Sequence, residues 1–317
     1  MQLIRGLHNI RPEHRGCVAT IGNYDGVHLG HRTILEALKQ QAFELDAKVC
    51  VITFEPQPRE FFQPDSAPPR LSNLREKLAL LSESYVDQVL CLPFNHRLRC
   101  LNANEFGRQV LVEGLDVQYL IVGDDFRYGS QREGDFHHLQ ALGESSGFEV
   151  CDTRTVLLEQ SRISSTRVRN SIAMNCLDEA EQLSGHPFTM MGRVVKGQQL
   201  GRKLGFPTAN IRIHRRRLPL QGVFAVRVRI DGHSFNAVAN LGVRPSVIPS
   251  RSSVNGSVPV LEVHMLDFMG DLYGQTLRVE FIEKIRDEQK FESLEALRAA
   301  IGNDIEVARK MLLNRYT

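Results

Sequence analysis

The chain has 317 residues, of which 42% are hydrophobic and 24% charged, with a formal net charge of +2. This is the composition of an ordinary soluble protein, and the length suits two domains better than one. The small net charge gives no general attraction to nucleic acid or membranes, and the one basic run, His214–Arg217, is short and has no aromatic neighbour. Neither a signal-peptide pattern nor an apolar run that could span a bilayer is present. We therefore expect a cytoplasmic protein that acts on small molecules, without nucleic-acid or membrane partners.

Six cysteines are scattered along the chain, and no two of them form a C-x-x-C pair. Structural zinc and a disulfide framework are therefore not predicted. Several of the cysteines lie in apolar runs, where a free thiol behaves as a small hydrophobic group.

The first half of the chain alternates short apolar β-rich runs with segments of helical periodicity. This alternation predicts a parallel sheet with helices on both faces and ligands bound beyond the carboxyl ends of the strands. A capping box formed by Asn102 and Glu105 supports the third helix. The expected strands are Cys17–Ile21, Lys48–Phe54, Gln88–Leu92 and Gln118–Val122, and the expected helices are Arg32–Leu45, Arg75–Glu83 and Glu105–Glu113.

Two histidines, His28 and His31, follow the glycine-bearing turn between the first expected strand and the first expected helix. Glycines let the backbone approach a ligand closely, and a helix N-terminus favours a phosphate. The turn residues Gly22, Asn23 and Asp25 are therefore candidate nucleotide contacts, and two imidazoles here would stabilise a phosphate under attack. Histidines on such turns are also often plain surface residues. The order strand, glycine turn, His-x-Gly-His, helix resembles the nucleotidyltransferase superfamily, and it is neither a G-x-G-x-x-G fingerprint nor a Walker loop.

Two further polar segments of the first half are candidate ligand contacts. Asp125, in Gly123–Gly129, follows an expected strand and suits a ribose hydroxyl, an adenine amine or a magnesium-bound water; the alternative is a polar loop with an internal Asp–Arg pair. Ser165 and Thr166 open a helical segment, where hydroxyls and amides hold phosphate oxygens or simply cap the helix. Arg169, one turn on, suits bidentate binding of a phosphate.

Near residue 184 the pattern changes, and Ser184–Pro187 interrupts the helical periodicity. We expect a domain boundary here, with one domain over 1–184 and the other over 185–317. Short, evenly spaced β segments then predict a small antiparallel barrel or sandwich. The chain ends in a helix that Ser293 caps and that Gly302–Asp304 is expected to break, with Asp304 capping the second piece. The expected strands are Met190–Val195, Val223–Ile230, Phe235–Leu241, Val260–Leu266 and Thr276–Ile285.

Three residues of the second half carry oxygen atoms suited to chemistry. In Gly201–Asn210, glycine and proline fix the backbone while Thr208 and Asn210 project oxygens from alternate positions. Mg²⁺ prefers such ligands, although a rigid turn with two hydrogen-bonding side chains would have the same sequence. Glu262 lies on an apolar β run and is the candidate general base, but alternation alone does not decide whether it faces solvent. His264, on the same face, is interpreted as a structural histidine.

Five of these segments occur in an order that resembles the bacterial bifunctional riboflavin kinase/FMN adenylyltransferase family, the prokaryotic FAD synthetases. The likeness runs nearly the whole chain and is most specific in the Pro-Thr-Ala-Asn tetrad at 207–210, which follows Gly-Arg-x-Leu-Gly. Tyr24 and Ser246 replace the more usual Phe and Thr, and Asp125 stands where some relatives have Asn. The five segments are Gly22–His31, Gly123–Gly129, Ile163–Arg169, Gly201–Asn210 and Val260–Gly274.

The resemblance implies an α/β Rossmann-like nucleotidyltransferase domain followed by a six-stranded antiparallel β-barrel riboflavin kinase domain with a C-terminal helix. It implies Mg²⁺ as cofactor, ATP as co-substrate, and riboflavin, FMN and FAD as substrates and products. In the kinase site Glu262 would accept the proton of the ribityl 5′-hydroxyl as it attacks the γ-phosphate of ATP, and Thr208 and Asn210 would hold Mg²⁺. Further contacts in the kinase site would come from Gly201, Arg202, Gly205 and Pro207.

In the adenylyltransferase site, the phosphate of FMN would attack the α-phosphate of a second ATP and release pyrophosphate. The attacking phosphate is already ionised at neutral pH, so the site needs charge stabilisation rather than a base. The resemblance assigns that role to His28 and His31 with Mg²⁺ and helix-end amides. Ser165, Thr166 and Arg169 would hold pyrophosphate, and Asp125 would contact the adenosine or the flavin.

Three other interpretations stay open at this point. A nucleotidyltransferase acting on phosphopantetheine, nicotinate mononucleotide or glycerol phosphate would explain only the first half of the chain. A flavin-sensing or RNA-binding regulator would be favoured by loss of Glu262, His28 or Thr208, and all three are present. A chain with kinase activity alone is disfavoured by intact His28, His31 and Arg169. We expect a monomer or a weak homo-oligomer.

Overall fold

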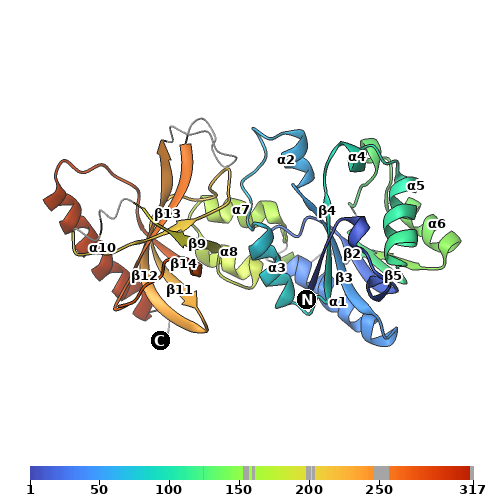
Figure 1. Cartoon of the computed structure of the whole chain (residues 1–317), viewed down its shortest axis with the longest axis horizontal. Coiled ribbons are helices and arrows are strands. Elements are labelled where there is room, and N and C mark those ends of the chain that lie inside the picture. The colour runs from blue at the N-terminus through green and yellow to red at the C-terminus, as the bar shows by residue number, and fades with distance from the viewer. Residues whose placement is uncertain are drawn as a thin grey trace. The chain divides into compact units, whose positions relative to one another are not determined.

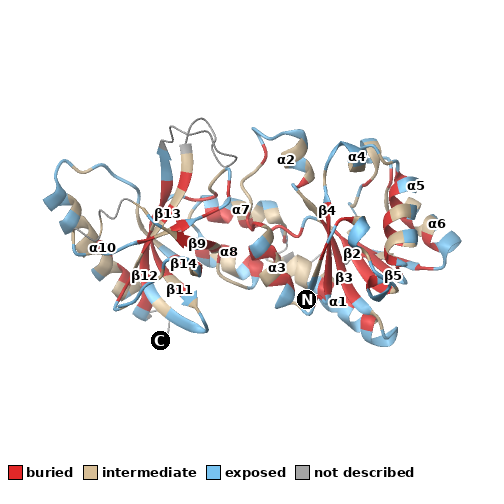
Figure 2. Cartoon of the chain, viewed as in Figure 1, coloured by how far each residue is buried: buried red, intermediate tan, exposed pale blue. Residues whose placement is uncertain are grey.

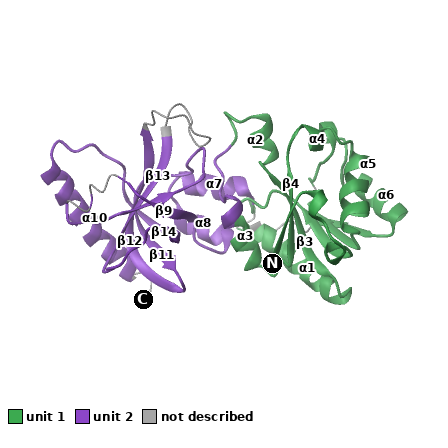
Figure 3. Cartoon of the chain, in the orientation of Figure 1, with its two compact units in different colours: residues 1–67, 77–163 green, residues 68–76, 164–317 purple. Residues whose placement is uncertain are grey.

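The computed structural model describes residues 1–123, 125–152, 157–158, 161–197, 201, 204–245 and 257–314. The chain divides into two compact units (Figure 3): unit 1 holds residues 1–67 and 77–163, and unit 2 holds residues 68–76 and 164–317. The helices α7 (Ser165–Ala173) and α8 (Leu177–Ser184) therefore pack with unit 2. The domain boundary between residues 184 and 185 stays a prediction. No helix in the described part is long and apolar enough to cross a membrane.

Unit 1 is built on a parallel sheet of six strands in the order β1-β4-β3-β2-β5-β6 (Figure 1). The predicted α/β class is thereby confirmed. The two edge strands, β1 and β6, were not predicted, because each has a single buried residue and therefore no apolar run. The strands are β1 (Gln2–Arg5), β2 (Cys17–Ile21), β3 (Lys48–Glu55), β4 (Gln88–Pro93), β5 (Tyr119–Val122) and β6 (Glu149–Asp152).

Both faces of this sheet are buried, as Figure 2 shows for its central strands. Successive side chains of a strand point to opposite faces. On β2, Val18 joins one apolar cluster while Cys17 and Ala19 join the other, and on β3 the neighbours Val49 and Cys50 divide in the same way. The sheet therefore separates two hydrophobic cores, one on each face.

Helices supply the outer wall of each core. The cluster that contains Val18 takes its helical residues from α1 and α3. The cluster that contains Cys17 and Ala19 takes them from α5, η3 and α6. The predicted capping box at Asn102 and Glu105 is confirmed, with hydrogen bonds of 2.8 and 2.9 Å. Unit 1 also has a small ribbon of β7 (Leu157–Leu158) and β8 (Ser161–Arg162). The helices of four or more residues before α7 are α1 (Leu29–Glu44), α2 (Pro58–Phe62), α3 (Leu74–Ser82), α4 (His96–Arg99), α5 (Ala103–Phe106), the π-helical η3 (Gly107–Leu115) and α6 (Phe136–Ser146).

Unit 2 contains a closed antiparallel barrel of six strands in the order β10-β13-β12-β11-β14-β9. This confirms the predicted barrel and adds β10, a strand that begins inside the Pro-Thr-Ala-Asn tetrad. The strands are β9 (Thr189–Val195), β10 (Ala209–Arg212), β11 (Gly222–Ile230), β12 (His233–Pro245), β13 (Ser257–Met265) and β14 (Thr276–Arg286).

The C-terminal helix α10 (Leu294–Asn314) covers part of the outer face of the barrel, where Ala308 and Leu312 pack with apolar residues of β11, β12 and β14. Ser293 accepts a hydrogen bond from the backbone N–H of Ala296, as predicted for the cap. The expected break at Gly302–Asp304 is wrong, because α10 is continuous there. The carboxylate of Asp304 does not cap a second helix. It accepts two hydrogen bonds of 2.8 and 2.7 Å from the guanidinium group of Arg286.

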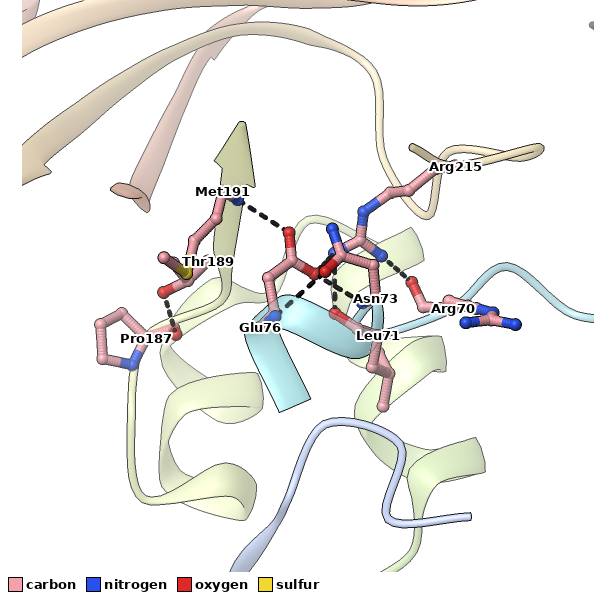
Figure 4. A network of polar contacts seen from close by, with 8 residues as sticks. All are labelled: Arg70, Leu71, Asn73, Glu76, Pro187, Thr189, Met191 and Arg215. Carbon is pink, nitrogen blue, oxygen red and sulfur yellow. Dashed lines mark hydrogen bonds and ion pairs between the residues drawn. The ribbon is translucent and has the colours of Figure 1, made fainter. Parts of the chain in front are cut away.

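The segment 68–76 belongs to unit 2 because a buried network of polar contacts attaches it to the barrel (Figure 4). The Glu76 carboxylate accepts hydrogen bonds from Arg215 Nη2 at 2.6 Å, from the Met191 N–H at 2.7 Å and from the Asn73 N–H at 2.7 Å. Arg215 donates further bonds to the carbonyls of Arg70 and Leu71. The side chains of Arg215 and Glu76 are only 1% and 3% exposed. Each buried charge is therefore compensated by the opposite charge of the other residue.

Candidate functional site

The two histidines of unit 1 stand together at the start of α1. His28 is the N-cap residue and has extended backbone angles, and His31 lies in the first turn. Their rings stack with centroids 3.7 Å apart and planes 15° from parallel. Nδ1 of His31 is buried and has no hydrogen-bond partner within the described residues. The structure thus brings two imidazoles and the free amides of a helix N-terminus to one place.

Contacts of Tyr24 stabilise the turn that precedes α1. Tyr24 lies against His31, with ring centroids 4.6 Å apart, and donates a hydrogen bond of 2.9 Å to the Thr20 hydroxyl. Tyr24 and Val27 have positive φ angles of 47° and 40°, a conformation that side chains rarely adopt. Such a backbone persists only where its surroundings fix it, which is typical of functional turns. Gly22 continues β2 toward this turn, and Asn23 is exposed while Asp25 is buried.

A buried lysine, Lys77 of α3, faces the same turn and was not predicted. Lys77 is 0% exposed, and its Nζ lies 3.2 Å from the hydroxyl of Thr53. That hydroxyl lies 3.4 Å from the carbonyl of Asn23. Burial lowers the pKa of His31 well below 6.5, and the charges of His28 and Lys77 lower it further. His31 is therefore neutral at pH 7 and can donate or accept a hydrogen bond without carrying charge.

An aromatic cluster lies at the carboxyl ends of β3 and β4 in unit 1. Phe94 is the centre of the cluster, with ring centroids 5.9 Å from Phe54, 5.4 Å from Phe61 and 5.6 Å from Phe62. Phe62 is 57% exposed, so part of the cluster is open to solvent. The sequence resemblance included Phe54, but the cluster joins residues from three segments, so no local pattern announces it.

The loop that holds Asp125 is more open. Asp125 forms an ion pair of 3.3 Å with Arg162, and both side chains are largely exposed. Asp125 thus pairs with an arginine of β8, whereas the alternative considered from the sequence was a pair within the loop. An exposed pair of this kind contributes little to stability and leaves the carboxylate accessible to a ligand.

The predicted phosphate-binding hydroxyls lie in unit 2 at the start of α7. Ser164 caps this helix by accepting a hydrogen bond of 3.2 Å from the Arg167 N–H, so Ser165 and Thr166 occupy its first turn. Arg169 donates a hydrogen bond of 2.7 Å from Nε to the carbonyl of Pro69. Both features that the sequence left open, a helix cap and an anion-binding N-terminus, fit this geometry.

In the barrel of unit 2, Asn210 and Glu262 are brought directly opposite each other. Asn210 on β10 pairs with Glu262 on β13, and Glu262 pairs with Asn240 on β12. Their apolar neighbours Ala209, Leu261 and Ala239 are buried, so the three polar residues form one row on the outer face of the barrel. The Glu262 side chain keeps 20% of its surface exposed. Alternation alone left the environment of Glu262 undecided, and the strand register supplies its face and its neighbours.

Two contacts hold the predicted base and the adjoining loop. Arg244 Nη2 lies 2.9 Å from Glu262 Oε2, so the carboxylate is ion-paired. Nδ1 of His264 lies 2.8 Å from the carbonyl of Pro207, and since a carbonyl only accepts, this nitrogen carries the proton. His264 is thus a structural histidine, as interpreted from the sequence, and it fixes the residue that precedes Thr208.

Two glycines leave room for the predicted metal ligands. A Cβ atom at Gly197 would collide with the side-chain amide of Asn210, and one at Gly201 would lie 3.2 Å from the Thr208 hydroxyl. Gly205 has a φ of 89°, which favours glycine. Of the remaining candidates, Arg202 lies outside the described residues.

The oxygens of Thr208 and Asn210 suit Mg²⁺ shared with a nucleotide, since this ion takes oxygen ligands and keeps waters or phosphates around it. No group of three or more His, Cys, Asp or Glu side chains that could hold a metal ion is found in the described part of the chain.

Comparison with known proteins covers both units. The FAD synthetase family model matches residues 10–167, and the riboflavin kinase family model matches residues 184–312. A Pseudomonas fluorescens protein named bifunctional riboflavin kinase/FMN adenylyltransferase is 55% identical over 98% of each chain. An Escherichia coli protein of the same name is 48% identical over 98% of this chain and 97% of that one. A crystal structure from Streptococcus pneumoniae, described as a macrolide-efflux protein, matches 98% of this chain and 99% of that one with a TM-score of 0.81 and 28% identity.

Proposed function

This chain belongs to the bifunctional riboflavin kinase/FMN adenylyltransferase family, and we propose that it makes FAD from riboflavin in two steps on two separate sets of residues. The barrel row of unit 2 phosphorylates riboflavin with ATP, and the histidine turn of unit 1 transfers the adenylyl group of a second ATP to FMN. The observation that carries the proposal is the 55% identity to a bifunctional relative over 98% of each chain. A likeness of this extent includes both halves.

In phosphoryl transfer, the protein's task is positioning and charge neutralisation. Glu262 accepts the proton of the ribityl 5′-hydroxyl as that oxygen attacks the γ-phosphate of ATP. To do so it exchanges its ion pair with Arg244 for a hydrogen bond to the hydroxyl. Thr208 and Asn210 are the residues that would hold Mg²⁺, which neutralises charge on the nucleotide phosphates when bound. Gly201, Gly205 and Pro207 shape the loop next to them, with Arg202 as a further predicted contact.

In adenylyl transfer, the phosphate of FMN attacks the α-phosphate of ATP and pyrophosphate leaves. No proton has to be removed from the nucleophile, so the groups that matter are those that stabilise charge on the pentacoordinate phosphorus. His28, neutral His31 and the N-terminal amides of α1 supply this stabilisation. Gly22, Asn23 and Asp25 line the same turn. The roles of Asp125 toward adenosine or flavin, and of Ser165, Thr166 and Arg169 toward pyrophosphate, stay predictions of the sequence.

The aromatic cluster around Phe94 is where we place the isoalloxazine ring of FMN in unit 1. Flat rings stack on exposed aromatic faces, and Phe62 is the most exposed member. The cluster lies beyond the carboxyl ends of β3 and β4, the edge of a parallel sheet at which ligands bind.

We further propose a cytoplasmic protein that works as a monomer or weak homo-oligomer, without nucleic-acid or membrane partners. Its six cysteines are all free, and this suits a reducing compartment.

The experiment that tests the function is a time course with purified protein, riboflavin, ATP and Mg²⁺, with flavins separated by chromatography. FMN should appear first and then convert to FAD, and excess EDTA should stop both steps. FMN without FAD would leave only the kinase assignment. Absence of any new flavin would refute the proposal.

A further inference from the structure

The polar row on the outer face of the barrel contains one residue that the predicted site does not include. Asn240 on β12 lies directly opposite Glu262, on the side away from Asn210. Neighbouring strands are about 4.8 Å apart, so the two asparagines flank the carboxylate at similar distances. Three polar side chains in one row, on adjacent strands, form a strip suited to a substrate that crosses the strands.

The amide oxygen of Asn240 is buried, and it has no hydrogen-bond partner in the described part of the chain. A buried polar atom without a partner is destabilising, and native proteins keep few of them. Asn240 is only partly buried as a residue, and a rotation of its side-chain amide would present the oxygen to a ligand that lies on the row. The amide oxygen of Asn240 can accept a hydrogen bond from a ligand, and the hydroxyls of a sugar alcohol chain are suitable donors.

The row also has a direction. Thr208 and Asn210 would take the metal and phosphates on one side of Glu262. In phosphoryl transfer the attacking and leaving oxygens lie roughly in line on opposite sides of phosphorus. The alcohol that loses its proton to Glu262 must therefore extend away from the nucleotide, toward Asn240.

We propose that Asn240 is a substrate-binding residue of the phosphoryl-transfer site, whose amide oxygen accepts a hydrogen bond from a ribityl hydroxyl next to the one that attacks. This inference rests on the proposed kinase function of the row. It separates the row into a nucleotide side at Asn210 and an acceptor side at Asn240.

The test is the variant Asn240→Leu, which keeps a branched side chain, although a larger one, and removes the acceptor. We expect kcat/KM for riboflavin to fall about 10- to 100-fold, as for loss of a buried hydrogen bond, with KM for ATP unchanged. The matched control is Asn236→Leu on the same strand, an exposed position at which kinase kinetics should not change. Adenylylation of added FMN, measured in the same preparations, should stay at the parental rate.

An unchanged kcat/KM for riboflavin would overturn the proposal, and so would a loss confined to KM for ATP. If Asn240→Leu does not fold, Asn240→Ser is assayed with riboflavin and with a flavin that lacks the neighbouring ribityl hydroxyl. The proposal requires a loss with riboflavin that disappears with the deoxy flavin, and equal losses with both would refute it. Failure of the proposed function itself is distinguishable, because the parental protein would then form no FMN from riboflavin and ATP.

Discussion

In the proposed mechanism, the chemistry of each unit depends on single titratable residues. Glu262, the proposed proton acceptor, is a carboxylate in a partly exposed row and is ion-paired to Arg244. Burial and the charges of His28 and Lys77 lower the pKa of His31 and keep it neutral. In the proposed mechanism it therefore serves as a hydrogen-bonding group rather than as a fixed charge. The two residues belong to different units, and each can be tested while the other activity serves as an internal control.

The variant Glu262→Gln is expected to lower riboflavin phosphorylation by roughly 10²–10⁴-fold, because the amide cannot accept the proton of the attacking hydroxyl. FMN adenylylation should continue at the parental rate in the same sample. Steady-state assays with riboflavin and with FMN check both statements. An equal loss of both activities in a folded variant would contradict the assignment.

The titration of His31 predicts a pH-dependent stability. Below pH 6.5 the unfolded histidine binds a proton, whereas native His31 does not because its pKa is lowered. The unfolded state therefore gains protons as the pH falls, and unit 1 loses about 1.4 kcal/mol per pH unit below 6.5 from this group.

Thermal unfolding of the parent and of His31→Gln, compared between pH 8 and pH 5.5, measures this contribution. The groups that face His31 are His28, Tyr24 and Lys77. The variant should lose less stability on acidification than the parent. Parallel pH profiles would show that His31 does not titrate as expected.

At the scale of elements, the segment 68–76 behaves as part of the barrel although it lies within the first half of the sequence. Its anchor, Glu76, accepts bonds from Arg215 and from the backbone of β9. Buried ion pairs contribute little net stability against an apolar replacement, but loss of one partner leaves a buried charge uncompensated. The segment therefore stabilises unit 2 mainly by neutralising Arg215.

The variant Glu76→Gln should destabilise unit 2 by about 3–5 kcal/mol, because the Arg215 guanidinium stays buried without a counter-charge. Urea unfolding with riboflavin kinase activity as the probe follows this unit. The control Asp267→Asn breaks an exposed ion pair with Arg309 and should change stability little. Adding Arg215→Met to Glu76→Gln should recover stability, and a double variant as unstable as the single one would contradict the explanation.

For the whole molecule, the open question is whether the second domain is autonomous. The predicted boundary gives a fragment of residues 185–317, which contains the whole barrel and α10 but lacks 68–76 and α7–α8. The row of Asn210, Glu262 and Asn240 lies entirely within the fragment, whereas Glu76, the partner of Arg215, does not.

The fragment 185–317 is expected to fold and phosphorylate riboflavin, but to unfold at lower urea concentration than unit 2 does in the full chain. Arg215→Met in the fragment should raise its stability, since it removes the uncompensated charge. Co-expression with residues 1–184, which restores 68–76, is the second comparison. An insoluble or inactive fragment that Arg215→Met does not rescue would show that the boundary is wrong.

Local physics alone determined much of this protein. Periodicity predicted the alternating strands and helices, because the side-chain repeat of an element is a property of a few neighbouring residues. The cap at Ser293 and the capping box at Asn102 followed for the same reason. The site motifs on continuous turns, His28 with His31 and Thr208 with Asn210, were readable because their members are close in the sequence.

Contacts between distant segments were decided only by the tertiary structure. Asn240 joins Glu262 through strand register, and Glu76 meets Arg215 through packing of a segment from the other half of the chain. The helix α10 continues through Gly302 because burial of its apolar stripe and the Asp304–Arg286 pair outweigh the cost of about 1 kcal/mol for glycine in a helix. Such outcomes depend on which surfaces meet, and no short stretch of sequence contains that information.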